Sequence, residues 1–198
     1  MVIKGGQPIA VDARVVLKPT SCPAPLHLAV SPYPAQYESW VQLPDVGDLL
    51  IRPIRPEDAQ LLLELFDTLS PQSIYYRFFA PLKQLSPAML ARFTQIDYDR
   101  EMALIAVTGH DGQEEELAVG RYVTNSDGVS CEFALVVSDK WQRLGIGHRL
   151  MSLLIRIARD RGLEHMEGEV LSGNTKMLGL MKSLDFRVSN HPDDVSIQ

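Results

Sequence analysis

The feature that most constrains the fold is a strand-like run that is joined to an amphipathic helix by a loop with two glycines. Residues 129–137 are mostly apolar, and leucines recur at helical spacing within 145–161. Gly145 and Gly147 stand between the two elements, where glycine lets the backbone turn tightly and approach a ligand. Because the first N–H groups of a helix are free and its dipole is positive there, such a start binds anions. The glycines together with the helix start indicate a pyrophosphate site. The glycine pair alone is equally typical of an ordinary turn.

Two common nucleotide-binding motifs do not fit this loop. A dinucleotide fold needs G-x-G-x-x-G after the first strand of a βαβ unit. Here Leu150 occupies the third glycine position, and the preceding strand belongs to an antiparallel meander. A nucleoside triphosphate loop needs Gly-Lys followed by Ser or Thr, and the passage has no such sequence. Both motifs are therefore excluded here.

The elements around the loop predict an α/β fold, a mixed sheet with helices on both faces. Turn sequences at 110–112 and 125–128 separate three strand-like runs, which predicts an antiparallel meander. Strand-like runs lie at 46–53, 101–108, 116–124, 129–137, 163–171 and 186–188. Helices are expected from Arg55-Pro56, from Ser70 to Tyr76 or beyond, from Ser86 to about Gln95, at 145–161 and at 174–184.

A change in composition divides the chain before this fold. Residues 9–17 are rich in valine and predict one strand. Prolines at positions 19, 23, 25, 32 and 34 then predict an extended linker. We therefore place a tail at 1–17, a proline-rich linker at 18–45 and the globular domain at 46–198.

The composition argues against several classes of partner. The net charge is −6 and the Lys and Arg residues are scattered, so the chain lacks the basic footprint of a nucleic-acid binder. No apolar run reaches the roughly eighteen residues that suggest a membrane span. Cys22 and Cys131 are too few and too far apart for a disulfide framework or a zinc site. We expect a cytoplasmic protein without metal, nucleic acid or membrane partner, and the oligomeric state stays open.

The passage Gln142-Arg-Leu-Gly-Ile-Gly147 resembles the Q/R-x-x-G-x-G/A signature of the GNAT superfamily of N-acetyltransferases. Residues 49–188 are also similar to that fold in element order. The resemblance implies a mostly antiparallel sheet that splays at the site of acetyl-CoA, the acyl donor. It implies cofactor contacts from Leu135, Val136, Val137, Gln142, Arg143, Leu144, Gly145, Ile146, Gly147 and Asn174.

Three further passages narrow the resemblance. IRPIRPEDAQLL, LSPQSIYYRFF and TQIDYDREMALIAV are similar to the C-terminal domain of Pat-type bacterial protein lysine acetyltransferases. Those proteins join a GNAT domain to a region resembling an NDP-forming acyl-CoA synthetase, and IAVDARVVL resembles the last strand of its ATP-grasp part. The resemblance implies a protein lysine as acceptor, on an acyl-CoA synthetase-like enzyme. A small-amine acetyltransferase and an acetyl-CoA-sensing regulatory module are the alternatives.

Glu132 is the candidate general base. The lysine ammonium, whose pKa is about 10.4, must lose a proton before it attacks a thioester. Glu132 is a lone acid in an otherwise apolar strand. Its position alone predicts either a desolvated carboxylate suited to a base or a side chain that points to solvent, and the Pat resemblance implies the base. Tyr122 and Arg121, on the neighbouring strand, either line the cleft or serve packing and a surface ion pair. A backbone amide near Val137 is expected to hold the oxyanion.

Two positions depart from the pattern that the resemblance implies. Many GNAT enzymes have a tyrosine seven residues after the asparagine, as general acid, but this sequence has Met181 there. Asp185 stands where glycine is usual. A thiol with a pKa near that of cysteine, about 8.5, leaves as the thiolate with little help. The loss of the tyrosine is therefore compatible with catalysis, but it leaves the acid step unassigned.

Overall fold

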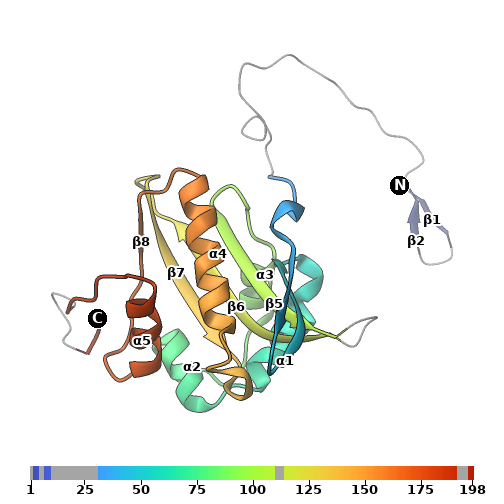
Figure 1. The fold of residues 1–198 in the computed structure, drawn as a ribbon. Helices are drawn as coiled ribbons and strands as arrows, with labels where there is room; N and C mark the ends of the chain where they lie inside the picture. Colours follow the sequence, from blue (N-terminus) through green and yellow to red (C-terminus); the bar gives the residue numbers. More distant parts are fainter. Residues whose placement is uncertain (1, 5–6, 10–30, 110–113, 191–195) are drawn as a thin grey trace.

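The computed structural model describes residues 2–4, 7–9, 31–109, 114–190 and 196–198, and a six-stranded sheet forms its centre (Figure 1). The strand order is β3-β4-β5-β6-β7-β8. These strands are β3 (Ser39–Leu43), β4 (Gly47–Pro53), β5 (Glu101–Thr108), β6 (Glu115–Thr124), β7 (Ser130–Val137) and β8 (His165–Glu167). Every neighbouring pair is antiparallel except β7 and β8, which are parallel. The predicted antiparallel meander is confirmed.

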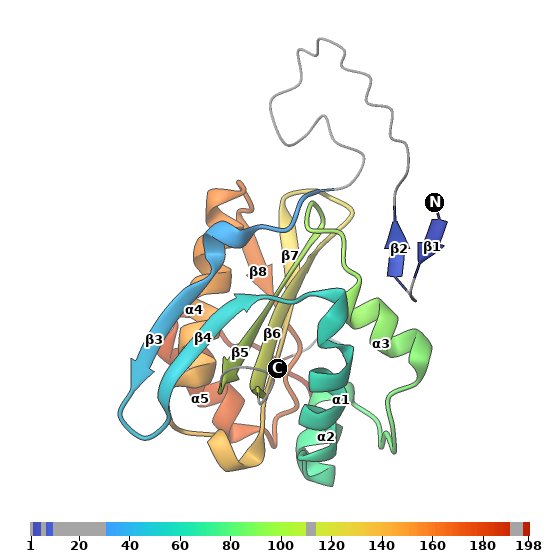
Figure 2. The ribbon, with the colours of Figure 1, turned by 90° about the vertical axis from the view of Figure 1, so that its right-hand side faces the viewer.

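Helices cover both faces of the sheet, as predicted (Figures 1 and 2). The α-helices are α1 (Ala59–Asp67), α2 (Pro71–Phe78), α3 (Pro87–Thr94), α4 (Ile146–Asp160) and α5 (Thr175–Ser183). Short 3-10 turns are η1 (Ala35–Tyr37), η2 (Pro56–Asp58) and η3 (Asp139–Trp141). Apart from the sheet, β1 (Val2–Lys4) and β2 (Gln7–Ile9) form an antiparallel pair. Among the described residues, no helix is long and apolar enough to cross a membrane.

Two apolar cores hold the helices against the sheet. On one side, Leu150 and Leu154 of α4 are fully buried with Tyr122 of β6. On the other, Leu65 of α1 packs in a second cluster with Ile105 of β5. Each side chain of this size contributes about 1.5–3 kcal/mol when it is removed from water. The alternation of strand residues between these two cores fixes the sheet register.

Serine and proline define where α2 and α3 begin, as the sequence predicted. The hydroxyl oxygens of Ser70 and Ser86 accept hydrogen bonds from the N–H groups three residues later, both at 3.2 Å. Pro71 and Pro87 occupy the first helical positions, where the absent N–H costs nothing. These caps fix the residues at which α2 and α3 begin.

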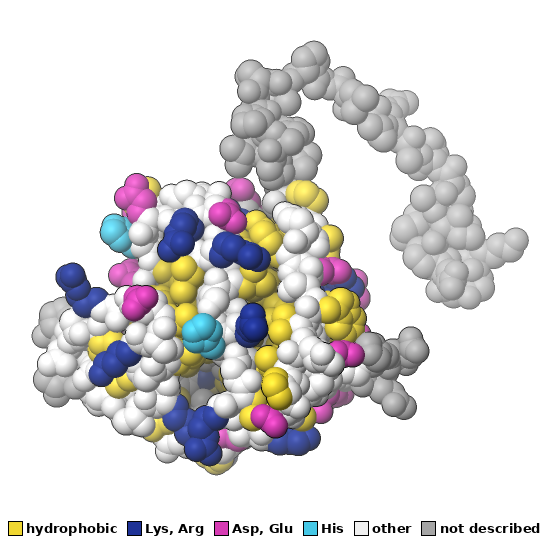
Figure 3. Space-filling view, viewed as in Figure 1, with side chains coloured by type: hydrophobic (Ala, Val, Ile, Leu, Met, Phe, Trp, Pro, Cys, Tyr) yellow, Lys and Arg dark blue, Asp and Glu magenta, His cyan; other side chains and the backbone are white. Residues whose placement is uncertain are grey.

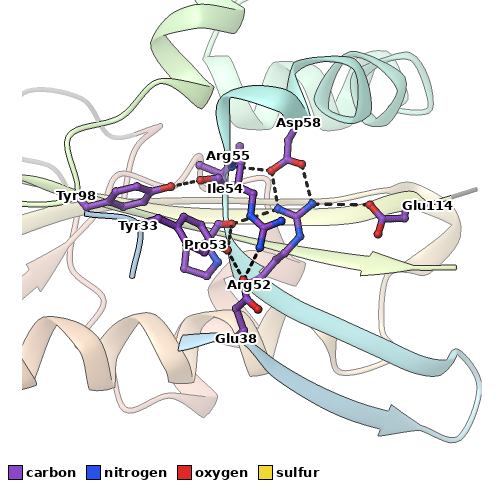
Figure 4. A network of polar contacts seen from close by, with 9 residues as sticks. All are labelled: Tyr33, Glu38, Arg52, Pro53, Ile54, Arg55, Asp58, Tyr98 and Glu114. Atoms are coloured by element: carbon purple, nitrogen blue, oxygen red, sulfur yellow. Dashed lines mark hydrogen bonds and ion pairs between the residues drawn. The ribbon is translucent and has the colours of Figure 1, made fainter. Parts of the chain in front are cut away.

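A buried ion pair connects β4 to η2, the turn that leads into α1 (Figure 4). The guanidinium of Arg52 donates two hydrogen bonds of 2.7 Å to the two carboxylate oxygens of Asp58, and both side chains are almost fully buried. The backbone N–H of Arg55 also donates to Asp58 at 2.6 Å. Beside this pair, the hydroxyl of Tyr33, just before η1, contacts both Glu38 and the carbonyl oxygen of Pro53 in β4. The network therefore connects η1, β4 and α1.

The sheet also splays as expected, because β7 and β8 part early. β7 pairs with β6 from Cys131 to Val137, but it pairs with β8 only through Ser130, Cys131 and Glu132. Beyond Glu132, the backbone groups of β7 that face away from β6 therefore have no strand partner in the part of the chain that the structure describes. This opening is the main consequence of the fold for function.

Several predicted boundaries were wrong. β3 lies inside the range 18–45 that we assigned to the linker, and it forms a hairpin with β4. The strand expected at 163–171 is only β8, because the backbone of Val170 pairs instead with Gln198 at the chain end. Phe186 begins no strand and packs against Phe133 with ring centroids 5.4 Å apart. Of the strand expected at 9–17, only its first residue lies within the described residues.

We predict that Asp58→Ala lowers the free energy of unfolding by about 3–5 kcal/mol, because it leaves the buried Arg52 charge with only the half-exposed carboxylate of Glu114, 3.8 Å away. Urea denaturation measures this loss. Arg92→Ala is the matched control, because Arg92 pairs with Glu101 at 2.8 Å while its side chain is 56% exposed. That change should cost less than about 1 kcal/mol. Equal losses in the two variants would contradict the structural role of the buried pair.

Candidate functional site

A cavity of about 550 Å³ opens where β7 and β8 have parted. The second half of β7 lines one side, and the loop before α4 lies at one end. Side chains of α2 and α5 form the other walls. Figure 3 shows the corresponding hollow between α5 and the start of α4, with Lys or Arg side chains at its edge.

The glycine loop has the geometry of an anion site. Gly145 adopts a left-handed φ of 86° and caps the N-terminus of α4. No acidic residue lies in the first turn of α4, so its free N–H groups and positive dipole face the cavity uncompensated. A Cβ on Gly147 would lie 3.3 Å from Leu135, so glycine lets this turn approach β7 closely. An anionic group at this helix start is favoured by both charge and hydrogen bonding.

Most of the residues predicted to contact the cofactor come together here. Leu135, Val136, Val137, Gln142, Arg143, Gly145, Gly147 and Asn174 line the cavity. Leu144 and Ile146 do not line it: Leu144 is half-buried, and Ile146 is 1% exposed within the α4-side core. Ile146 stands between two glycines that face the cavity, so the helical period turns its side chain toward the core.

Glu132, the candidate base, lies at the point where the two strands part. It pairs with Glu167 as the last residue of the β7–β8 register, and its side chain is exposed rather than desolvated. It is not among the residues that line the cavity. The guanidinium of Arg77, on α2, interacts electrostatically with Glu132. Of the two alternatives predicted from the sequence, the structure has the solvent-facing one.

The position of the missing tyrosine does not face the cavity. Met181 is 3% exposed in the α4-side core, whereas Leu180 and Ser183 of the same helix line the cavity. Asp185 adopts a left-handed φ of 62°, a conformation that aspartate tolerates better than most residues. The departure at Asp185 therefore retains the backbone turn that a glycine would make. Tyr122, on β6, is fully buried and serves packing.

The structure reveals a tyrosine in the cavity wall that the sequence analysis did not select. Tyr76 comes from α2, and its hydroxyl donates a 2.8 Å hydrogen bond to the carbonyl oxygen of Gly173, just before α5. Helical spacing places Ser73, Tyr76 and Arg77 on one side of α2, and all three line the cavity. This spacing was visible in the sequence, but only the sheet shows which side of α2 faces β7.

A carboxylate holds α2 to the loop after β7. Asp139 accepts hydrogen bonds from the N–H of Ser70 at 2.8 Å and from the hydroxyl of Ser73 at 2.8 Å. Burial raises the pKa of Asp139, but these hydrogen bonds outweigh it and hold the pKa below its usual value. Nearby, the Lys176 ammonium donates to the side-chain oxygen of Gln142 at 2.7 Å. These contacts link η3 to α2, and the glycine loop to α5, around one end of the cavity.

Comparison with known proteins agrees with this geometry. Residues 68–186 match the family model described as Acetyltransferase (GNAT) family. The chain is 35% identical over 158 residues to acetyltransferase PA5475 of Pseudomonas aeruginosa, covering 79% of this chain and 85% of that protein. The chain therefore belongs to the GNAT acetyltransferase family, whose members use acetyl-CoA as acyl donor.

Solved structures give the same result. The GNAT domain of Streptomyces lividans PAT has 30% sequence identity and a TM-score of 0.75, with 84% of this chain and 96% of that chain covered. A cAMP-binding acyltransferase from Mycobacterium smegmatis has 25% identity and a TM-score of 0.52, with 76% of this chain and 44% of that chain covered. The described residues include no cluster of side chains that could hold a metal ion.

The hydrogen bonds of Asp139 predict that its contribution to the free energy of unfolding depends on pH. The folded pKa of Asp139 lies below its unfolded value of 3.8, so the carboxylate stabilises the fold above about pH 3.8. This contribution is lost as the pH falls through the folded pKa. Asp139→Asn should therefore lower stability at pH 6, by less than about 1 kcal/mol because Asp139 is exposed. Urea denaturation at pH 6 and pH 3 measures the difference.

The difference between the wild type and Asp139→Asn should shrink at the lower pH. Asp67→Asn, on the exposed end of α1, controls for the loss of a surface charge. A gap between wild type and Asp139→Asn that grows as the pH falls would contradict this assignment.

Proposed function

We propose that this acetyltransferase transfers the acetyl group from acetyl-CoA to the ε-amine of a protein lysine, in the cytoplasm, with an acyl-CoA synthetase-like enzyme as acceptor. The main support for acetyl-CoA binding is the opening between β7 and β8 beside the free N-terminus of α4. The likeness to the GNAT domain of S. lividans PAT supports a protein as acceptor. The identity of the acceptor rests on the similarity of the passages between Ile51 and Val107 to Pat-type enzymes.

In the proposed binding mode, the pyrophosphate of acetyl-CoA lies on the loop that ends at Gly145 and Gly147. Arg143 and Lys176, which line the same end of the cavity, balance its charge. The pantetheine arm then follows β7, where the backbone beyond Glu132 has no described strand partner on the β8 side. The amide groups of the arm can pair with these free backbone groups as a short strand would.

The chemistry requires a proton acceptor near the thioester. The neutral lysine nitrogen attacks the carbonyl carbon, a C–N bond forms, and the C–S bond breaks to release the thiolate of CoA. We assign the removal of the amine proton to Glu132 through a water molecule, because its exposed side chain lies beside the opening rather than in the cavity wall. A free backbone N–H of β7 near Val137 supports the oxyanion.

We predict that Gly145→Ala weakens acetyl-CoA binding roughly tenfold, which corresponds to about 1.4 kcal/mol. An alanine strains the left-handed turn that aims the N–H groups of α4 at the pyrophosphate. Isothermal titration calorimetry measures the change. Gly128→Ala is the matched control, because Gly128 has a φ of 71° and equally open space but lies in the turn before β7, outside the cavity. Equal affinities in the two variants would contradict the role of the loop.

We predict that Glu132→Gln lowers kcat for a lysine peptide by about 10²–10⁴, the usual contribution of a general base. Acetyl-CoA affinity and stability should not change, because the side chain is exposed. The loss should shrink as the pH approaches the pKa of the lysine, since the amine then loses its proton to solvent. Glu167→Gln, at the paired position on β8, is the control. An unchanged rate in Glu132→Gln removes Glu132 from the base role.

The acceptor is tested by incubation of the protein with labelled acetyl-CoA and a cell lysate, followed by mass spectrometry of the labelled proteins. Label on a lysine of an acyl-CoA synthetase-like enzyme is the expected result. Rapid turnover of free amines with no labelled protein would instead identify a small-amine acetyltransferase. Tight acetyl-CoA binding with no transfer to either class would identify a sensing module.

A further inference from the structure

A second, smaller cavity of about 30 Å³ lies on the α1–α3 side of the sheet. Its wall is apolar, with side chains such as Leu65, Phe78 and Phe93, apart from the guanidinium groups of Arg77 and Arg121. Arg77 and Val136 also line the large cavity, so the two spaces meet at these residues. The small cavity therefore adjoins the large cavity at these two residues.

The two arginines are held in place mainly by aromatic rings. Arg121, on β6, is 8% exposed, donates one hydrogen bond of 2.9 Å to the carbonyl oxygen of Phe93, and lies 4.8 Å from the centre of that ring. Arg77 lies 5.0 Å from the ring centre of Phe78, and no hydrogen bond of its guanidinium is found among the described residues. Several N–H donors of the two guanidiniums thus remain free for a ligand.

Neither charge is neutralised by a neighbouring acid. Among the described residues, no carboxylate oxygen lies within 4.0 Å of either guanidinium. For Arg77, the acid that interacts electrostatically is the exposed Glu132. Arg121 interacts electrostatically with two acids, Glu101 and Glu116, and with two cations, Arg77 and Arg92.

The two acids near Arg121 do not offset its charge. Glu101 already forms an ion pair of 2.8 Å with Arg92. Burial raises the pKa of Glu116 well above its usual value, which favours its neutral form, and no oxygen of Glu116 lies within 4.0 Å of the Arg121 guanidinium. Burial, and then the proximity of Arg77, lower the pKa of Arg121 to about 10, which leaves it charged at neutral pH. The apolar cavity therefore carries an excess of positive charge.

Such an arrangement favours an anionic ligand. Buried charges are costly unless they are paired, and removal from water strengthens the attraction to an ion of opposite sign. The planar fork of a guanidinium matches a carboxylate with two parallel hydrogen bonds. A volume of about 10–15 Å³ holds one water molecule, so 30 Å³ admits a group of two or three heavy atoms. A carboxylate has this size.

We propose that Arg77 and Arg121 bind a substrate carboxylate at the junction of the two cavities. The carboxylate belongs either to the far end of a dicarboxylic acyl group on CoA or to the acceptor beside its amine. The inference rests on the proposed function in one respect, namely that the acyl end of the donor reaches Val136.

The acyl source is tested with two donors of equal size, malonyl-CoA and its uncharged counterpart isovaleryl-CoA. Calorimetry on the full chain should show that malonyl-CoA binds roughly tenfold to hundredfold more tightly, the range for hydrogen bonds to a charged group. Arg77→Met and Arg121→Met should each remove this preference. Arg156→Met, which changes an exposed arginine of α4 outside both cavities, should retain it. Acetyl-CoA serves as the reference ligand for each variant.

The acceptor source is tested with two peptides that end in the same lysine, one with a free carboxylate and one with an amide. With acetyl-CoA as donor, the carboxylate peptide should have the lower KM, by roughly tenfold or more, and the same two methionine variants should abolish the difference. Arg121→Lys keeps the charge without the fork, so it should retain only part of the preference. Thermal unfolding of each variant establishes that it is folded.

The outcomes separate the inference from the proposed function. A preference in one arm that disappears in Arg77→Met or Arg121→Met supports the inference and identifies the source of the carboxylate. If neither arm shows a preference, or if the preference survives both substitutions, the inference is overturned while normal acetyl-CoA binding leaves the proposed donor site intact. If acetyl-CoA itself does not bind, the proposed function and the inference both fail.

Discussion

The early end of pairing between β7 and β8 is the constraint on which the rest of the site depends. Because the parallel register stops at Glu132, the second half of β7 keeps backbone groups that have no strand partner among the described residues. Unpaired backbone groups away from water are costly, so this stretch is stable only beside solvent or a ligand. The helix start at Gly145 and the wall formed by α2 gain their significance from this opening.

Charge is distributed differently in the two parts of the molecule. The pair of Arg52 and Asp58 is buried and fully bonded, so it contributes to one defined arrangement of β4 and α1. Arg77 and Arg121 each lie against one aromatic ring and lack such a partner among the described residues. The first arrangement is complete within the chain, whereas the second is completed by a ligand. The contrast separates a structural ion pair from a recognition site.

The sequence predicted the meander, the major helices and the loop at Gly145 because each depends on local patterns of turn residues and apolar spacing. It failed where long-range pairing decides. β3 carries little signal after a proline-rich stretch, and only its pairing with β4 makes it a strand. Val170 pairs with the chain end, which no local pattern reveals. Tyr76 and Arg77 were missed because their role depends on which side of α2 faces β7.

The hydrogen bonds of α2 have a thermodynamic consequence. Its N-terminal end is attached through Asp139 to the turn after β7, and Tyr76 attaches its C-terminal half to the loop before α5. Both attachment points adjoin residues that line the large cavity, while Arg77 on the same helix reaches the small one. Because residues of α2 line both cavities, a shift of this helix on binding one ligand would change the affinity for the other. Such linkage is reciprocal, so the factor by which the first ligand changes the affinity for the second equals the factor by which the second changes the affinity for the first.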